Sequence, residues 1–383
     1  PFVWLPTITN PCAVSPLQWR SMAASGAGAV LPLSHAEAIR YIEKDLLCGI
    51  QGARSMRLLD DCEPTAELVE YLREVLVSRG KSTKDWRCIM NKRIGLSYRS
   101  CSFGLVWLDD KLEQVHRTAT QLGIQRHLPL LAATPASDAA AAKKLWAAAR
   151  QQVALNSSFV VKPRHGSNSK YVAMWPCPAQ ANEEAILESI EAALCAEDPS
   201  WRRESWNQNA VTKGAVLQPL YALMADVLET GEKDLTKLQK PLELKVQVLF
   251  GEVVGACLNS HPMYLWVTRD GEVIQWDPKT IGLLKKGHGL WEDLPPQIFY
   301  LLVTSLSEHW PQIRQDSEAV AHGLDELRVD WLLGDPVWGP RIGELTYMGT
   351  MALDVFPVSW RLAKAFAAAH LSRREDRRLE PFG

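Results

Sequence analysis

The pattern of apolar and polar residues changes character near residue 158. Before that point apolar residues recur at helical spacing, as at Leu68, Leu72 and Val75, until Gly80 ends the segment. After it, short segments rich in β-branched and aromatic residues predict strands, with Gly or Asn between several of them. The predicted strands span 158–161, 171–175, 215–219, 242–250, 252–258, 264–268 and 273–276. We therefore expect an α+β protein whose first hundred residues are mainly helical.

Further helices are predicted at four places in the chain. Ser34 is suited to cap a helix, because the apolar residues that follow it share one face. Segment 109–131 predicts a helix followed by a short apolar strand. Segment 137–154 is rich in Ala, which favours a helix because Ala loses little side-chain entropy. Segment 297–310 predicts a helix before the last pair of strands.

Composition narrows the class of protein. The chain has 383 residues, which suggests two or three domains, and 47% apolar against 22% charged residues is ordinary for a globular protein. Its formal net charge of -2 gives no reason to expect nucleic acid or an acidic membrane surface as a partner, so any anion site has to be local. No apolar run approaches the roughly 20 residues that a transmembrane helix needs.

The cysteines are widely spaced and form no C-x-x-C pair of the kind found in zinc sites and redox motifs. They are Cys12, Cys48, Cys62, Cys88, Cys101, Cys177, Cys195 and Cys257. This spacing is typical of reduced, mostly buried thiols, so we expect a cytoplasmic protein.

The first segment with candidate chemistry is a strand, a polar loop and a second strand in 159–172. Lys162 ends the first strand, and the loop contains Gly166 and Ser167. Lys162 would project toward a phosphate, while loop amides around Gly166 would close over the phosphate chain as a nest of N–H donors. The alternative is an ordinary solvated hairpin, which is what a lysine before Pro and a polar turn most often marks.

The second segment consists of two strands joined by a turn that contains Gly334 and Gly339. Alternation places Arg328 and Asp330 on one face of the first strand, and Glu344 and Thr346 on one face of the second. Two carboxylates, a hydroxyl and a guanidinium would then converge on one patch, which suits magnesium and phosphate oxygens. The alternative is a plain salt bridge between the arginine and one carboxylate.

Together these segments resemble the ATP-grasp superfamily. Arg328-Val329-Asp330 and Glu344-Leu345-Thr346 are similar to the paired metal-binding strands of D-alanine-D-alanine ligases, where an R-V-D-F strand precedes an E-x-N strand. Asp109-Asp110-Lys111-Leu112 is similar to the D-K-L segment of those ligases. The G-E-L-T sequence at 343–346 looks closest to the TupA-like branch, which is associated with polypeptide addition in cell-surface polymers. The resemblance covers roughly 109–366.

The resemblance implies which residues bind ATP. Lys111 and Lys162 would hold the α- and β-phosphates, and a hinge strand would read adenine through its backbone groups. The implied ATP-binding residues are Lys111, Lys162, Gly166, Ser167, Gln218, Pro219, Leu220 and Lys245. No acid is assigned to the ribose, because the segment between the hinge and Lys245 is long and charged.

The resemblance also implies a catalytic and metal-binding set. Arg328 would neutralise charge on the transferred γ-phosphate, and Lys245 would face the nucleotide as a second catalytic cation. Asp330, Glu344 and Thr346 would hold magnesium. Thr346 replaces the Asn usual in the family and offers one neutral oxygen, so the number of magnesium ions, one or two, stays open.

The fold implied by the resemblance has three parts. Residues 1–105 would form a mainly helical N-terminal domain outside the ATP-grasp fold. Residues 106–220 would form a linker helix and the first α+β lobe, and residues 221–383 the second lobe with the metal site. The two lobes would hold ATP between two antiparallel sheets.

The resemblance implies a carboxylate-amine ligase that uses ATP and magnesium. A substrate carboxylate would attack the γ-phosphate to give an acylphosphate and ADP, and an amine would then displace phosphate to form an amide. The partners would be a small-molecule carboxylate and a small-molecule amine. Two alternatives stay open: a kinase acting on a hydroxyl or a carboxylate, and an inactive nucleotide-binding module.

Several residues near these motifs have two interpretations. His165 and His261 could contact phosphate or act as a base, or could be ordinary surface or core histidines, which is the more frequent case. The segment 348–351 could line an acceptor pocket or merely turn the chain. His127 shows no spacing typical of a metal ligand.

Overall fold

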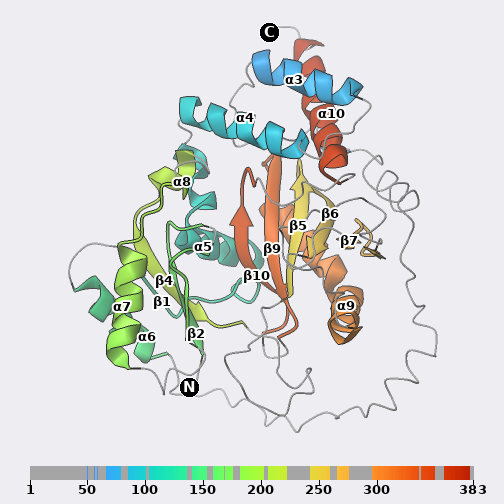
Figure 1. The fold of residues 1–383 in the computed structure, drawn as a ribbon. Helices are drawn as coiled ribbons and strands as arrows, with labels where there is room; N and C mark the ends of the chain where they lie inside the picture. The colour runs from blue at the N-terminus through green and yellow to red at the C-terminus, as the bar shows by residue number, and fades with distance from the viewer. Residues whose placement is uncertain are drawn as a thin grey trace, which may run out of the picture.

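The structure is a computed structural model in which the chain forms two lobes, each built on an antiparallel sheet (Figure 1). It describes residues 50, 56, 58, 66–78, 85–100, 103–135, 140–152, 158–167, 169–175, 182–201, 206–221, 242–258, 265–275, 296–335, 338–349 and 358–379. The expected α+β class is confirmed. The helix expected after Ser34, the charged segment after the hinge, and His261 lie outside the described residues.

The first lobe contains a four-stranded antiparallel sheet in the order β1-β4-β2-β3. Its strands are β1 (Ala132–Pro135), β2 (Phe159–Pro163), β3 (Ala173–Trp175) and β4 (Gly214–Pro219). Two helices, α6 (Ala141–Arg150) and α7 (Glu183–Leu194), cover one face. Phe159 and Val161 pack under these helices, so alternation turns Lys162 to the opposite face.

The second lobe contains a six-stranded antiparallel sheet in the order β10-β9-β5-β6-β7-β8. Its strands are β5 (Leu242–Leu249), β6 (Glu252–Leu258), β7 (Leu265–Val267), β8 (Val273–Gln275), β9 (Glu326–Leu333) and β10 (Arg341–Thr346). The helix α9 (Pro296–Val320) covers the apolar face of this sheet, where Trp331 Nε1 donates to Ser317 Oγ at 2.9 Å. This helix is ten residues longer at its end than expected, because Ile313 and Val320 are buried beyond Pro311.

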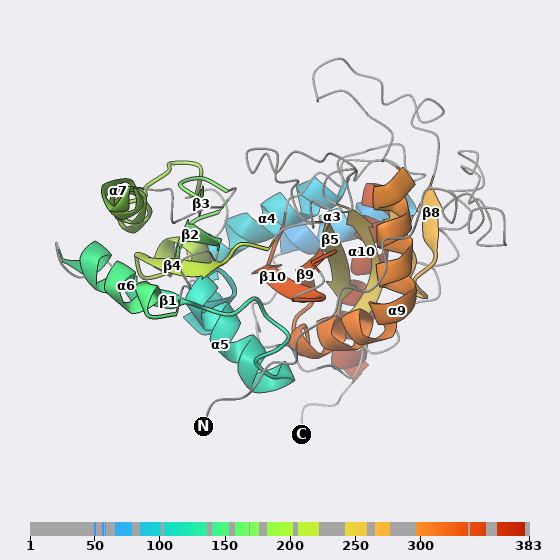
Figure 2. The same cartoon turned by 90° about the horizontal axis from the view of Figure 1, so that it is seen from below.

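Three helices close one end of the second lobe: α3 (Ala66–Val77), α4 (Asp85–Ser100) and α10 (Val358–Leu379) (Figures 1 and 2). They share one apolar core with the six-stranded sheet. A buried ion pair adds to this contact: Arg93 Nη2 lies 2.5 Å from Asp325 Oδ1 and donates to Tyr347 Oη at 2.8 Å. Although desolvation opposes its charge, Arg93 and His370 hold the pKa of Asp325 at about 2. The boundary expected at residue 105 stays a prediction.

The helix α5 (Lys111–Leu122) lies between the two lobes (Figures 1 and 2). Asp110 caps it by accepting from Leu112 N at 3.0 Å, as its position before a helix predicts. Gln114 then fixes α5 to the second sheet, because its amide donates to Leu345 O at 2.8 Å and accepts from Leu345 N at 3.0 Å. The first turn of α5 therefore faces the second sheet.

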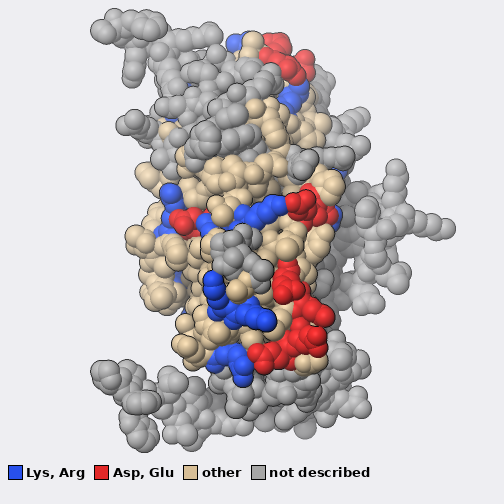
Figure 3. All heavy atoms as spheres, turned by 90° about the vertical axis from the view of Figure 1, so that its left-hand side faces the viewer, with Lys and Arg blue, Asp and Glu red and all other residues tan. Residues whose placement is uncertain are grey.

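The outer face of the first lobe carries both signs of charge side by side (Figure 3). The helix α8 (Trp206–Ala210) packs on the short 3-10 helix η2 (Phe103–Leu108), whose Leu105 and Leu108 belong to the core of the second lobe. Arg150 of α6 pairs with Glu183 of α7 at 3.1 Å across the surface. Within the described residues, no helix has the length and apolar character needed to cross a membrane.

Gly255 provides a test of the packing in the second sheet. Its φ is 142°, and a Cβ there would lie 2.1 Å from Cζ2 of Trp266, so Gly255→Ala should lower the free energy of unfolding by more than roughly 2 kcal/mol. Gly95→Ala is the control: it lies in α4 with nothing within 4 Å of a Cβ, and should stabilise by roughly 0.5–1 kcal/mol. Chemical denaturation of both variants measures this, and equal effects would contradict the packing.

Candidate active site

Four polar side chains share one face at the edge of the second sheet. In the antiparallel pair of β9 and β10, Glu344 lies opposite Asp330, and Thr346 lies opposite Arg328. Opposite residues in such a pair share a face, with their Cβ atoms about 4.5–5.5 Å apart. The prediction that these strands are antiparallel neighbours with the four side chains on one patch is confirmed.

A β-bulge at Gly343 is what aligns the two carboxylates. The register shifts between Ile342, which lies opposite Trp331 in the core, and Glu344. Without this extra residue Glu344 would stand opposite Val329, whose side chain is buried on the core side. Bulges commonly redirect a side chain next to a functional site.

Asp330 is the centre of the charges on this face. It is 1% exposed and accepts from Arg328 Nε at 2.6 Å, from Arg328 Nη2 at 2.8 Å and from Lys245 Nζ at 2.9 Å. Desolvation opposes its charge, but Arg328 and Lys245 hold the pKa of Asp330 below its ordinary value. The salt bridge left open by the sequence is therefore present, and Lys245 belongs to it.

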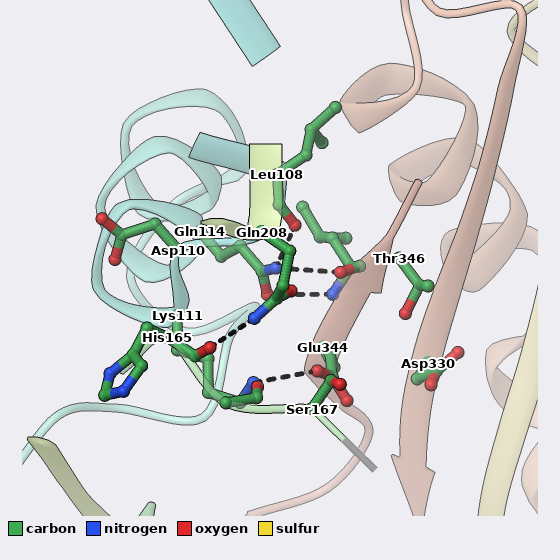
Figure 4. Close-up of polar contacts among 12 residues, drawn as sticks. Leu108, Asp110, Lys111, Gln114, His165, Ser167, Gln208, Asp330, Glu344 and Thr346 are labelled. Atoms are coloured by element: carbon green, nitrogen blue, oxygen red, sulfur yellow. Dashed lines mark hydrogen bonds and ion pairs between the residues drawn. The ribbon is translucent and has the colours of Figure 1, made fainter. Parts of the chain in front are cut away.

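The first lobe reaches this face through Lys111 (Figure 4). Its Nζ lies 3.1 Å from Glu344 Oε1, so the first turn of α5 and the edge strand β10 meet in an ion pair. Desolvation would raise the pKa of Glu344, but the charges of Lys111 and Arg328 hold it below its ordinary value. Glu344 is therefore ionised at neutral pH, and the structure brings the two lobes together at it.

Lys162 points from β2 toward the same charges. It is partly buried, and among the described residues its ammonium group has no hydrogen bond or ion pair. Desolvation lowers the pKa of Lys162, while the negative charge of Glu344 raises it. An unpaired, partly desolvated cation beside a carboxylate is suited to an anionic ligand.

The loop after Lys162 differs in detail from the expected nest of amides. Gly166 N donates to Pro163 O at 3.3 Å, and its carbonyl accepts from Lys111 Nζ. Ser167 O accepts from Trp201 Nε1 at 3.1 Å, while its buried hydroxyl has no partner among the described residues. Gly166 thus shapes the turn, and its carbonyl binds the Lys111 ammonium. The Ser167 hydroxyl is left to bond to a ligand.

The hinge segment continues β4 toward the second lobe. β4 pairs with β1 only as far as Leu217, so the ladder on that side stops before Gln218, Pro219 and Leu220. Gln218 Nε2 donates to Leu128 O at 3.0 Å, and Tyr221 Oη donates to Gly339 O at 2.9 Å. On the β1 side the backbone of 218–220 has no strand partner in the described sheet, although Pro219 has no N–H and Leu220 N already donates to Ser158 O at 3.0 Å.

Two further side chains at the site were missed from the sequence. Glu243 lies two residues before Lys245 on the same face, 3.2 Å from its Nζ, and desolvation raises its pKa. His127 is 2% exposed, and its Nδ1 donates to Leu128 O at 3.0 Å, so Nε2 is an acceptor with no partner among the described residues. The alternation of Glu243, Lys245 and Gln247 in β5 was a usable signal, whereas nothing local marked His127.

His165 is an ordinary core histidine. Its Nε2 donates to Ala196 O at 2.8 Å, and its Nδ1 accepts from Gly214 N at 3.3 Å. Both ring nitrogens are therefore used by the backbone of the first lobe. The structure favours the structural interpretation of His165 over a catalytic one.

The donor set fits a magnesium ion that is shared with a phosphate ligand. Within the described part of the chain, no group of three or more His, Cys, Asp and Glu side chains could hold a metal by itself. Magnesium usually takes one or two carboxylates and completes its shell with water and phosphate oxygens. Asp330 and Glu344 supply those carboxylates, while Thr346 Oγ accepts from Arg328 Nη2 at 2.9 Å.

Comparisons with known proteins give distant structural likenesses. No protein-family model and no curated protein matches the sequence. Among solved structures, D-cycloserine synthetase DcsG is similar with 18% identity, 80% of this chain and 93% of that chain covered, and a TM-score of 0.36. D-Alanine-D-Alanine ligase from Helicobacter pylori is 14% identical over 73% of this chain and 68% of that chain, with a TM-score of 0.38. ATP-grasp ligase PsnB, in a complex with a precursor variant, Mg and ADP, is 10% identical over 74% of this chain and 66% of that chain, with a TM-score of 0.34.

These are distant structural likenesses, and none of them assigns a function to this chain. At these identities and scores the function has to rest on the geometry of the site. The narrower resemblance to the TupA-like branch stays a prediction.

His127 makes the stability of the protein sensitive to acid. Desolvation lowers its pKa to about 4 from 6.5, so the unfolded chain binds a proton that the folded chain refuses between these values. The free energy of unfolding should therefore fall as pH falls from 7 to 5, and His127→Gln should remove roughly 2 kcal/mol of that fall. Denaturant titrations at both pH values measure this. The exposed His309→Gln is the control, and an unchanged pH dependence in His127→Gln would refute the assignment.

Proposed function

We propose that this protein is an ATP- and magnesium-dependent ligase that joins a carboxylate to an amine through an acylphosphate. The observation that carries the proposal is the meeting of Lys111 and Lys162 from one lobe with Arg328, Asp330 and Glu344 from the other. A nucleotide bound there would lie between two antiparallel sheets.

The balance of charge supports a polyphosphate ligand. Four cations, Lys111, Lys162, Lys245 and Arg328, stand against three carboxylates, Asp330, Glu344 and Glu243. Desolvation raises the pKa of Glu243 and lowers that of Lys162, so burial weakens one charge of each sign. The site therefore keeps a positive excess in a nearly closed environment, where electrostatic interactions are strong.

The lysines of the first lobe are suited to hold the α- and β-phosphates. Lys162 has no partner among the described residues, so phosphate binding would give it one without breaking a contact. Lys111 would exchange its ion pair with Glu344 for a phosphate oxygen, which frees that carboxylate for the metal. The buried Ser167 hydroxyl, which has no partner among the described residues, would offer a further donor.

The acids and the hinge complete nucleotide binding in this proposal. The backbone at 218–220 would read the adenine edge, and Glu243 would accept from the ribose hydroxyls. Glu243 suits this role because it lies at the end of the polar row on β5 and interacts electrostatically with Lys162. The sequence left this acid unassigned, and Glu243 would fill the role.

Asp330 and Glu344 would hold the magnesium ion. When bound, the ion would draw negative charge from the phosphates and orient them. Arg328 would neutralise charge on the transferred γ-phosphate, and the Thr346 hydroxyl would fix the orientation of its guanidinium at 2.9 Å. Thr346 is then a positioning residue in this proposal, in place of the expected metal ligand.

The reaction would proceed by positioning and charge neutralisation. A substrate carboxylate oxygen would attack the γ-phosphorus while the bond to the β-phosphate oxygen breaks, which releases ADP. An amine would then attack the acylphosphate carbon, lose a proton and expel inorganic phosphate. Neither step requires a nucleophilic side chain. His165 has no role in this proposal, because both of its ring nitrogens are hydrogen-bonded to the backbone.

Lys162→Met separates a phosphate-binding role from a structural one. Removing a desolvated, unpaired charge should leave the free energy of unfolding unchanged or raise it, while ATP affinity falls at least tenfold because a phosphate contact is lost. Thermal shift without and with ATP and Mg²⁺ measures the stability and the ATP affinity of each variant. For the parent, ATP at about 100-fold excess over Kd should raise the free energy of unfolding by roughly 2.7 kcal/mol. Lys213→Met, on the surface beside Glu197, is the control and should bind ATP normally.

Glu344→Gln tests the metal-binding role and the reaction. We expect ATP binding to lose its dependence on Mg²⁺ in this variant, because one of two carboxylate ligands is gone. Mass spectrometry of products formed from ATP, Mg²⁺ and a cell extract should then show a new amide with the parent and none with the variant. A phosphorylated product without an amide would indicate the kinase, and full activity of Glu344→Gln would refute the site.

A further inference from the structure

Two buried hydrogen-bond donors on the site face of the second sheet have no acceptor among the described residues. Gln247 Nε2 and Trp266 Nε1 are shielded from solvent and bond to nothing among the described residues. Gln247 is 2% exposed and Trp266 is 0% exposed. Leaving a buried donor unpaired costs about 1–3 kcal/mol, so two such donors in one place need an explanation.

The register of the sheet places Gln247 in one row with Arg328, and the Trp266 ring reaches this row from the neighbouring one, in which Trp266 lies opposite Cys257. Gln247 lies opposite Arg328 on β9 and opposite Gly255 on β6. The Trp266 ring fills the space above Gly255, and its Nε1 lies 2.8 Å from the position of a Cβ there. The Gln247 amide is therefore flanked by the indole N–H on one side and the guanidinium on the other.

Arg328 contributes a third free donor to this row. Its Nε and Nη2 bond to Asp330 and Thr346, while Nη1 has no hydrogen bond within the described part of the chain. A Cβ on Gly349 would lie 3.1 Å from Nη1, so the absence of a side chain there keeps this nitrogen open.

The three groups together select an acceptor-rich, anionic ligand. An indole N–H and a guanidinium can only donate, and a glutamine amide can present two hydrogens. A carboxylate accepts through two oxygens, and its bonds to a charged donor are about twice as strong as neutral ones. A cation or an amine would find no acceptor in the indole or the guanidinium.

We infer that Gln247, Trp266 and Arg328 form a subsite for a substrate carboxylate that is held and not phosphorylated. The strand order β10-β9-β5-β6 places Gln247 and the Trp266 ring on the side of Arg328 away from Glu344. A carboxylate that faces these donors turns its oxygens away from the metal-binding pair, whereas the reacting carboxylate has to present an oxygen to the γ-phosphorus. One substrate is therefore an amino acid or a dicarboxylate with a free carboxylate away from the reacting group.

This inference rests on the proposed function, because Arg328 serves both the phosphate and the carboxylate. Access is shared as well: Arg328 is 7% exposed and Lys245 is 5% exposed, so the whole face is closed to a similar degree. An opening that admits a nucleotide to Lys245 would also admit a carboxylate to Gln247, two residues further along β5.

The test uses the indole N–H of Trp266 as a reporter in the ¹⁵N-labelled full chain. Loss of one indole resonance in Trp266→Phe assigns it among the fifteen tryptophans. Titration with sodium acetate should move this resonance downfield to saturation, because its N–H gains an acceptor. Sodium chloride at equal ionic strength and glycinamide, which lacks a carboxylate, should leave it in place.

Matched variants separate the subsite from general structural effects. Trp331 Nε1 already donates to Ser317 on the opposite face of the sheet, so its resonance, assigned with Trp331→Phe, should not respond to acetate. Gln247→Met keeps the size of the side chain but removes the amide. We expect it to weaken the apparent acetate affinity at least fivefold without lowering Tm.

The outcomes distinguish this inference from the proposed function. A Trp266 resonance that stays fixed under acetate, or that chloride moves equally, overturns the subsite even when ATP and Mg²⁺ still stabilise the protein. Unchanged acetate affinity in Gln247→Met overturns it too. A saturable acetate response in a protein that ATP does not stabilise would support the subsite and refute the nucleotide site instead.

Discussion

The structure of the site depends on one buried negative charge. Asp330 is removed from solvent and keeps its charge because Arg328 and Lys245 both bond to it. Burying a carboxylate is unfavourable unless cations compensate its charge. Removing one member of such a buried ion pair is strongly destabilising, because the remaining charge is then uncompensated. The three residues therefore depend on one another. Their contacts fix the positions of the Arg328 guanidinium on β9 and the Lys245 ammonium on β5. The other functional groups are arranged around this cluster.

The two lobes meet at that cluster through a small number of polar contacts. Lys111 pairs with Glu344, Gln114 bonds to the backbone of β10, and Tyr221 bonds to the turn before it. Each of these contacts joins α5 or the end of β4 to the β9–β10 hairpin. A charged ligand would compete for Lys111 and Glu344. Its binding would therefore replace the ion pair that joins the two lobes.

Several polar groups on the site side of the two sheets have no hydrogen-bond partner among the described residues. They include the Lys162 ammonium, the Ser167 hydroxyl, the acceptor nitrogen of His127, and the donors of Gln247 and Trp266. The apolar sides, under α6, α7 and α9, are filled by close packing instead. Unpaired polar groups lower stability, so those that face the site would gain hydrogen bonds from a ligand. Other unpaired groups, such as Trp86 Nε1 and Asn207 Oδ1, lie away from the site.

The sequence by itself determined the strands, the α+β class and the pairing of β9 with β10, because alternation and turn residues act locally. It also singled out Lys111, Lys162, Arg328, Asp330 and Glu344. Only the tertiary structure decided that a bulge at Gly343 turns Glu344 toward Asp330, and that Gly166 N is used within its own turn. It also revealed His127, which reaches the site through the edge of β10. Register shifts and contacts between distant segments depend on how whole elements pack, and no local pattern encodes them.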